Sequence, residues 1–120
     1  MDLEAARTAM RLRDQGKRQA ELLQTLPPLT PESSRLLQQM YQIVEEVYAY
    51  PTLNQVIYPT YRFEYCARQL QHLPVPAQLA QIAPQLQACQ NQFGNTVSAQ
   101  AVACVRKAVA EAAQTTPSSP

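Results

Sequence analysis

The sequence predicts an all-α protein, a compact bundle of four or five antiparallel helices followed by a disordered C-terminal tail. Three observations support this class. Apolar residues recur at steps of three and four, which is the spacing of one buried helix face. Ten prolines and only two glycines divide the 120 residues into blocks of helical length. The connections between these blocks are short, which favours antiparallel neighbours.

The length suits a single domain, and we assign residues 1–114 to it and residues 115–120 to the tail. Ten basic and nine acidic side chains give a net charge of +1, which excludes the strongly basic surface of most nucleic-acid-binding proteins. The apolar fraction of 46% excludes a wholly disordered chain. No run of 18 apolar residues occurs, so no membrane span is expected.

The first helical block is predicted over residues 2–26, which are rich in strong helix formers. Gly16 weakens its centre, so it forms either one helix or two short ones, and two consecutive prolines end it. The second block is predicted to begin with Thr30 as N-cap and Pro31 at the first helical position. It carries an apolar stripe and ends at Pro51.

Residues 52–73 are ambiguous, because their β-branched and aromatic content also suits a pair of strands. Tyrosines at helical steps favour helices instead, and we predict a short helix over 52–58 and a longer one over 60–72. In the next block Pro84 either kinks a continuous helix or breaks it. The last helix is predicted over residues 99–113.

The residues of most catalytic and metal sites are missing. His72 is the only histidine and no Cys-x-x-Cys pair occurs, which excludes the usual zinc sites. Two glycines are too few for a phosphate-binding loop. Cys66 and His72 are six residues apart and do not face each other on one helix. We therefore expect no enzymatic activity, no metal and no cofactor.

Tyrosines are concentrated in one part of the chain, because all six lie between residues 41 and 65. Tyrosine offers a large contact area with a polar tip and is favoured at interfaces. The other interpretation is that these rings complete a core that lacks tryptophan. On the first interpretation the partner-binding residues are Tyr41, Tyr48, Tyr58, Tyr61, Arg62, Tyr65 and Arg68.

Charge is unevenly distributed, since residues 69–105 contain no Asp, Glu, Lys or Arg and are rich in Gln. Interface centres are depleted in charge, so this segment is a second candidate for partner contact. A compositional habit of the source organism explains it equally well. The basic residues of the first block are nearly cancelled by acidic neighbours, which predicts a solvated face rather than a nucleic-acid site.

The three cysteines give information on the cellular compartment of the protein, because disulfides form in oxidising compartments. An odd number favours reduced thiols, and no signal peptide is visible, so a cytoplasmic location is preferred. However, Cys89 and Cys104 fall at similar heights in a predicted helical hairpin. We predict that these two are neighbours and a possible disulfide, while Cys66 stays unpaired. A disulfide would indicate an extracytoplasmic location.

The sequence therefore predicts a non-enzymatic protein that binds another protein, as an assembly factor, adaptor or small subunit of a complex, with possible homo-oligomerisation. The alternative is a bundle that carries a small apolar ligand in a cavity lined by Tyr41, Tyr48, Tyr61 and Tyr65. An exposed tyrosine surface would favour the first function. An enclosed apolar cavity of roughly 300 Å3 or more would favour the second.

Overall fold

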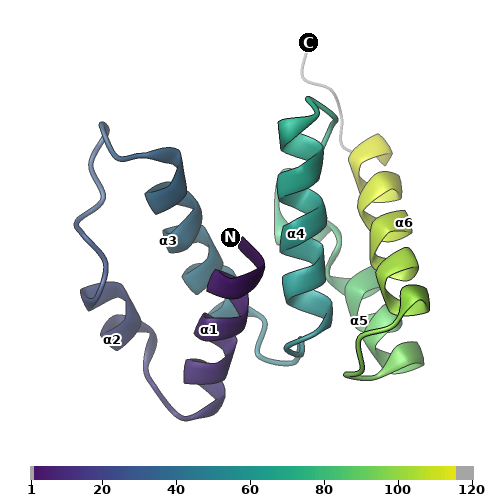
Figure 1. The fold of residues 1–120 in the computed structure, drawn as a ribbon, viewed down its shortest axis with the longest axis horizontal. Helices are drawn as coiled ribbons and strands as arrows, with labels where there is room; N and C mark the ends of the chain where they lie inside the picture. The colour runs from purple at the N-terminus through teal and green to yellow at the C-terminus, as the bar shows by residue number, and fades with distance from the viewer. Residues whose placement is uncertain (1, 116–120) are drawn as a thin grey trace.

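Helices account for most of the chain in the computed structural model, which describes residues 2–115 (Figure 1). The elements are α1 (Asp2–Asp14), α2 (Gln19–Gln24), α3 (Arg35–Ala49), α4 (Ile57–Leu70), the 3-10 turn η1 (Leu79–Gln81), α5 (Ala83–Phe93) and α6 (Ala99–Thr115). No strand occurs among the described residues, which confirms the all-α class. The predicted tail falls outside the described residues except for Thr115, which ends α6.

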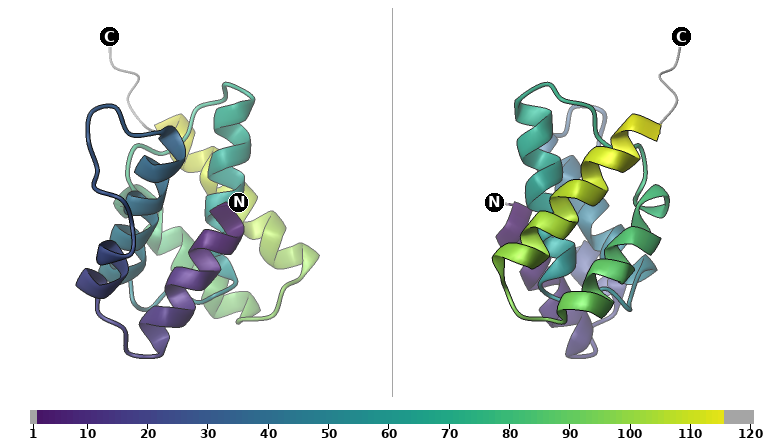
Figure 2. Two further views of the ribbon diagram at one scale, coloured as in Figure 1. Left: turned by 60° about the vertical axis from the view of Figure 1, so that its left-hand side comes forward. Right: turned by 90° about the vertical axis from the view of Figure 1, so that its right-hand side faces the viewer.

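The α4 helix lies at the centre of the fold. It packs against α1 on one side and against α5 and α6 on the other, as two further views make clear (Figure 2). The α1 helix also packs on α3, and α2 packs on α3. The consecutive helices α3 and α4 run in opposite directions, and their upper ends stand apart in Figure 1.

The core gathers aliphatic side chains from every long helix. Its largest fully buried members include two tyrosines and an arginine of α4 as well as aliphatic residues. The large aliphatic members of this fully buried set are Met10, Ile43, Val47, Ile57, Ile82, Leu86, Val105 and Val109. Burial of this set supplies the main driving force for folding, at about 1.5–3 kcal/mol for each large side chain.

The first predicted block is two helices, and the reason is local. Gly16 adopts a φ of +91°, a left-handed conformation that only glycine adopts readily, and this turns the chain between α1 and α2. The predicted start of the second block at Thr30 is wrong. The backbone N–H of Thr30 donates to Ser33 Oγ (2.7 Å), and this turn competes with a helix. The helix begins four residues later, capped by Ser34, whose Oγ accepts from the Leu37 N–H.

The predicted boundary between helices at residues 58–60 is also wrong. One continuous helix, α4, starts at Ile57 and contains Pro59 in its first turn, where a missing N–H leaves no hydrogen bond unmade. Asn54 Oδ1 accepts from the Ile57 N–H at 2.8 Å and helps to start the helix. Pro84 likewise occupies the first turn of α5, so of the two alternatives the break is observed and not the kink.

Candidate functional site

The tyrosine row of α4 is buried. Tyr58 and Tyr61 are 1% exposed and Tyr65 is 9% exposed, and neighbouring rings of this row lie 5.9 Å apart between centroids. Arg62 is fully buried, with its guanidinium 4.7 Å above the Tyr65 ring centre. These four residues therefore do not form the exposed surface that was expected. They are covered because α4 is enclosed by α1, α5 and α6.

A buried polar cluster joins α3 to α4. The Tyr58 hydroxyl donates to Glu46 Oε1 at 2.6 Å, and Arg62 Nη1 lies 3.4 Å from the same oxygen. Arg62 Nη1 also donates to Gln42 Oε1 at 3.3 Å. Burial raises the pKa of Glu46, although the Tyr58 hydrogen bond and the Arg62 charge act in the opposite direction. The cluster is a buried polar contact between two helices.

Sequence reasoning missed this cluster. Glu46 was not among the candidate site residues expected from the sequence. A signal was present, because Glu46 follows Ile43 by three residues and therefore lies on the apolar stripe of its helix. A carboxylate on such a stripe needs a buried partner, and Arg62 supplies one from α4.

The remaining predicted binding residues fasten loops to helices. Tyr41 donates from its hydroxyl to the Pro27 carbonyl at 2.8 Å, and the Tyr48 hydroxyl donates to the Lys17 carbonyl. Arg68 Nε donates to the Pro74 carbonyl at 2.7 Å and holds the chain that leaves α4. Each of these side chains is half-buried and already engaged. They stabilise the fold and do not line an open site.

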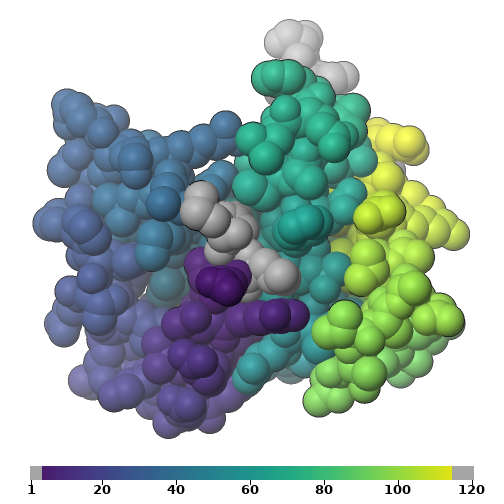
Figure 3. Space-filling model, viewed as in Figure 1, coloured from purple at the N-terminus to yellow at the C-terminus, as the bar shows by residue number. Residues whose placement is uncertain are grey.

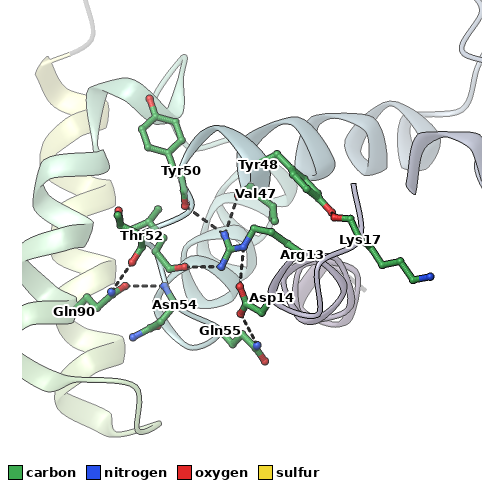
Figure 4. A network of polar contacts seen from close by, with 11 residues as sticks. Arg13, Asp14, Lys17, Val47, Tyr48, Tyr50, Thr52, Asn54, Gln55 and Gln90 are labelled. Carbon is green, nitrogen blue, oxygen red and sulfur yellow. Dashed lines mark hydrogen bonds and ion pairs between the residues drawn. The ribbon is translucent and has the colours of Figure 1, made fainter. Parts of the chain in front are cut away.

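A second polar network surrounds Arg13 at the end of α1 (Figure 4). Arg13 donates to the carbonyl oxygens of Val47, Tyr50 and Leu53, at 2.9, 3.4 and 3.2 Å. A guanidinium at the last carbonyls of α3 suits the negative end of that helix. Its contacts fasten α1 to the chain that connects α3 with α4.

Two of the three cysteines form a disulfide, and the third is a free thiol. Cys89 of α5 and Cys104 of α6 are joined by a disulfide, with their Cα atoms 5.9 Å apart. Cys66 of α4 is a free, half-buried thiol. The disulfide links α5, which lies within the charge-free segment 69–105, to α6, which begins in it, and both helices pack against each other and against α4.

The exposed apolar side chains of α3 and α4 border a groove. Phe63 is 57% exposed, Leu70 is 74% exposed and Leu36 is 45% exposed. The groove has a volume of about 440 Å3. Figure 3 shows the two helices that border it, α3 in blue and α4 in teal, in the upper part of the molecule. Its lining consists of Arg35, Leu36, Gln39, Phe63, Cys66, Ala67 and Leu70. Exposed apolar clusters of this kind commonly mark interaction sites.

A second depression, here called the hollow, lies among α1, α2 and α3. It measures about 450 Å3 and opens to solvent, and Leu36 lines both it and the groove. No tyrosine lines it, contrary to the cavity expected for a ligand carrier. Its lining consists of Glu4, Ala5, Thr8, Ala9, Leu12, Leu22, Thr25, Leu26, Leu36, Met40, Ile43 and Val44.

The groove was not predicted, because the expected interface was chosen for its tyrosine content and Phe63 was not selected. Residues two positions apart on a helix point about 200° apart, so Phe63 faces away from Tyr61 and Tyr65. The same helical phase carries Leu70, seven residues later, to the side of Phe63. The position of each residue around the helix axis, and not its aromatic character, separates the buried tyrosines from the exposed Phe63 and Leu70.

Other site types find no basis in the described part of the chain. Among residues 2–115, no three or more His, Cys, Asp or Glu side chains gather closely enough to hold a metal ion. Within the same residues, no helix combines the length and apolar character needed to cross a membrane. No protein-family model, curated protein or solved structure matches this chain.

Proposed function

We propose that the protein is a non-enzymatic protein-binding module, acting as an adaptor, assembly factor or small subunit, and that its partner covers the groove between α3 and α4. The supporting observation is the exposure of Phe63, Leu70 and Leu36 around one depression. Burying half-exposed side chains of this size favours association by about 1 kcal/mol or more each.

Two further features of the groove support binding. Among the side chains that the structure describes, its lining contains a single charged residue, Arg35, and interface centres are typically poor in charge. Phe63 and Leu70 project from a helix whose opposite face is anchored in the core by Tyr58 and Tyr61. The contact side chains are therefore held on a rigid element, which lowers the entropy lost on binding.

Affinity capture from the native source tests the proposal. The Leu70→Glu variant places a charge at the most exposed position of the groove and is expected to lose a partner that the wild-type protein retains. Val97→Glu is the matched control, because Val97 is 62% exposed in the loop between α5 and α6. Circular dichroism establishes that both variants fold. Identical retained proteins for the wild type and Leu70→Glu would refute the groove as the binding surface.

The hollow supports a second candidate function, the carriage of a small apolar ligand, although it opens to solvent and is not the enclosed cavity expected from the sequence. Its volume falls within the range of ligand pockets and its lining is mainly aliphatic. An apolar fluorescent probe is expected to bind the wild-type protein and the Leu70→Glu variant equally. Ala5→Phe, which places a ring in the hollow, is expected to abolish binding. A probe that binds Ala5→Phe unchanged would exclude this candidate.

A further inference from the structure

Residues of α3 and α4 also line a polar pocket of about 300 Å3. Every side chain of its lining can form hydrogen bonds, and among the side chains that the structure describes none of the lining is acidic. Arg35 and Gln39 also line the groove, but the other residues of the two sites differ. The lining of the polar pocket consists of Arg35, Gln38, Gln39, Gln42, Tyr65 and Gln69.

Two arginines fix the orientation of two of these glutamines. Arg35 Nη2 donates to Gln69 Oε1 at 2.9 Å, and Arg62 Nη1 donates to Gln42 Oε1 at 3.3 Å. Because a guanidinium group only donates hydrogen bonds, the oxygen of each amide must face its arginine. The amide N–H groups of Gln42 and Gln69 contact no acceptor among the described residues. Both glutamines therefore offer the pocket donors rather than acceptors.

The polar pocket also carries a positive charge. Arg35 is exposed, and no carboxylate among the described side chains forms an ion pair with it. By contrast, Arg62, which orients Gln42, lies 3.4 Å from the carboxylate of Glu46. Arg35 is the first residue of α3, and the first turn of this helix contains no acidic residue. A cation is unfavourable at the positive end of a helix, and an anion bound beside it would offset this.

We propose that the polar pocket binds a carboxylate group, with Arg35 as the cation and the amide N–H groups of Gln42 and Gln69 as further donors. An ionised carboxylate only accepts hydrogen bonds, and its planar shape matches the guanidinium fork. The single charge of Arg35 balances a carboxylate, whereas a phosphate group carries more negative charge at neutral pH. The volume is at the lower end of ligand pockets, which suits a small free acid or one acidic side chain of a partner.

An NMR titration of the full chain with sodium acetate, compared with sodium chloride at the same ionic strength, tests for a free carboxylate. The expected result is a saturable shift of the side-chain amide signals of Gln42 and Gln69. Arg35→Gln is expected to weaken binding about tenfold or more, because it removes the charged donor. Arg11→Gln, at an exposed arginine of α1, is the matched control and is expected to bind acetate as the wild type does. Tighter binding of inorganic phosphate than of acetate would overturn the assignment to a carboxylate.

The Gln69→Glu variant tests the donor role of the amide. A glutamate keeps an oxygen for Arg35, but it replaces the N–H donors by a negative charge, so binding of acetate is expected to be lost. Gln71→Glu is the matched control, because it adds the same charge at an exposed position two residues further on. Circular dichroism establishes that both variants fold. Equal binding of acetate by the two variants would contradict the proposed donor.

Affinity capture from the native source distinguishes the two sources of the carboxylate. Saturable binding of acetate supports a free acid as the ligand. If acetate does not bind, but Gln69→Glu loses a captured protein that Gln71→Glu retains, the carboxylate belongs to a partner. If acetate does not bind and both variants capture the same proteins, the polar pocket is not a carboxylate site. That failure leaves the proposed function intact, since Leu70→Glu tests the groove separately.

Discussion

The two faces of α4 carry similar side chains in opposite environments. Tyr58, Tyr61 and Tyr65 lie within the core, while Phe63 and Leu70 on the other face are more than half exposed. The buried face contains the more polar residues and the exposed face the more apolar ones. Residue type alone therefore does not determine which face of this helix is covered. The packing of α1, α5 and α6 determines it.

The largest expected effect is on the free energy of unfolding, when one ring of the buried face and one ring of the exposed face of α4 are removed in turn. Tyr61→Ala is expected to lower the free energy of unfolding by about 3–5 kcal/mol, the cost of removing a large buried aromatic side chain. Phe63→Ala, two residues away, is expected to change it by about 0.5 kcal/mol or less, as for most exposed positions. Urea denaturation of both variants measures the difference. Equal destabilisation would remove the distinction between the faces.

A disulfide joins α5 and α6, two of the helices that cover the buried face of α4. Replacing both Cys89 and Cys104 by serine is expected to lower the free energy of unfolding by about 3 kcal/mol, because the disulfide spans a sequence separation of 15 residues. Cys66→Ser is the control, with a smaller expected change. The protein is denatured and alkylated with and without prior reduction, and the labels are counted by mass spectrometry. One label is expected without reduction and three after reduction. Three labels without reduction would show that the bridge is absent.

A smaller effect concerns pH and Glu46, the α3 carboxylate that accepts a hydrogen bond from Tyr58 on the buried face of α4. Burial raises the pKa of Glu46 above its ordinary value of 4.5, so the folded protein holds this proton more tightly than the unfolded chain. Its contribution to stability is therefore fully present below the unfolded pKa and is lost as the pH rises through the folded pKa. Glu46→Gln keeps a similar shape without the titration.

The difference in unfolding free energy between the wild type and Glu46→Gln, measured by urea denaturation from acidic to neutral pH, tests this expectation. The wild type is expected to lose stability relative to Glu46→Gln as the pH rises. Glu45→Gln is the control, because Glu45 is the exposed neighbour of Glu46. A difference that stays constant with pH would show that burial does not govern this carboxylate.

Much of the fold follows from local sequence. Gly16 and the prolines divide the chain, and Ser34 and Asn54 start helices through hydrogen bonds to residues three positions ahead. The α-helical class and the approximate number of helices were predictable from these signals. The helix starts near Thr30 and Pro59 were not predictable from these signals. A proline fits any position in a first turn, and a serine can form a local turn in place of a helix cap, so each allows more than one starting residue.

The candidate site depended on contacts between residues far apart in the chain. Leu36 and Leu70 are 34 positions apart, and they border one groove only because α3 and α4 both pack against α1. The pairing of Glu46 with Arg62 likewise joins two helices. Helix formation is decided by neighbouring residues, because its hydrogen bonds close within one turn. Burial is decided by whichever helices lie above a given face, so which apolar residues remain open to a partner emerged only from the assembled bundle.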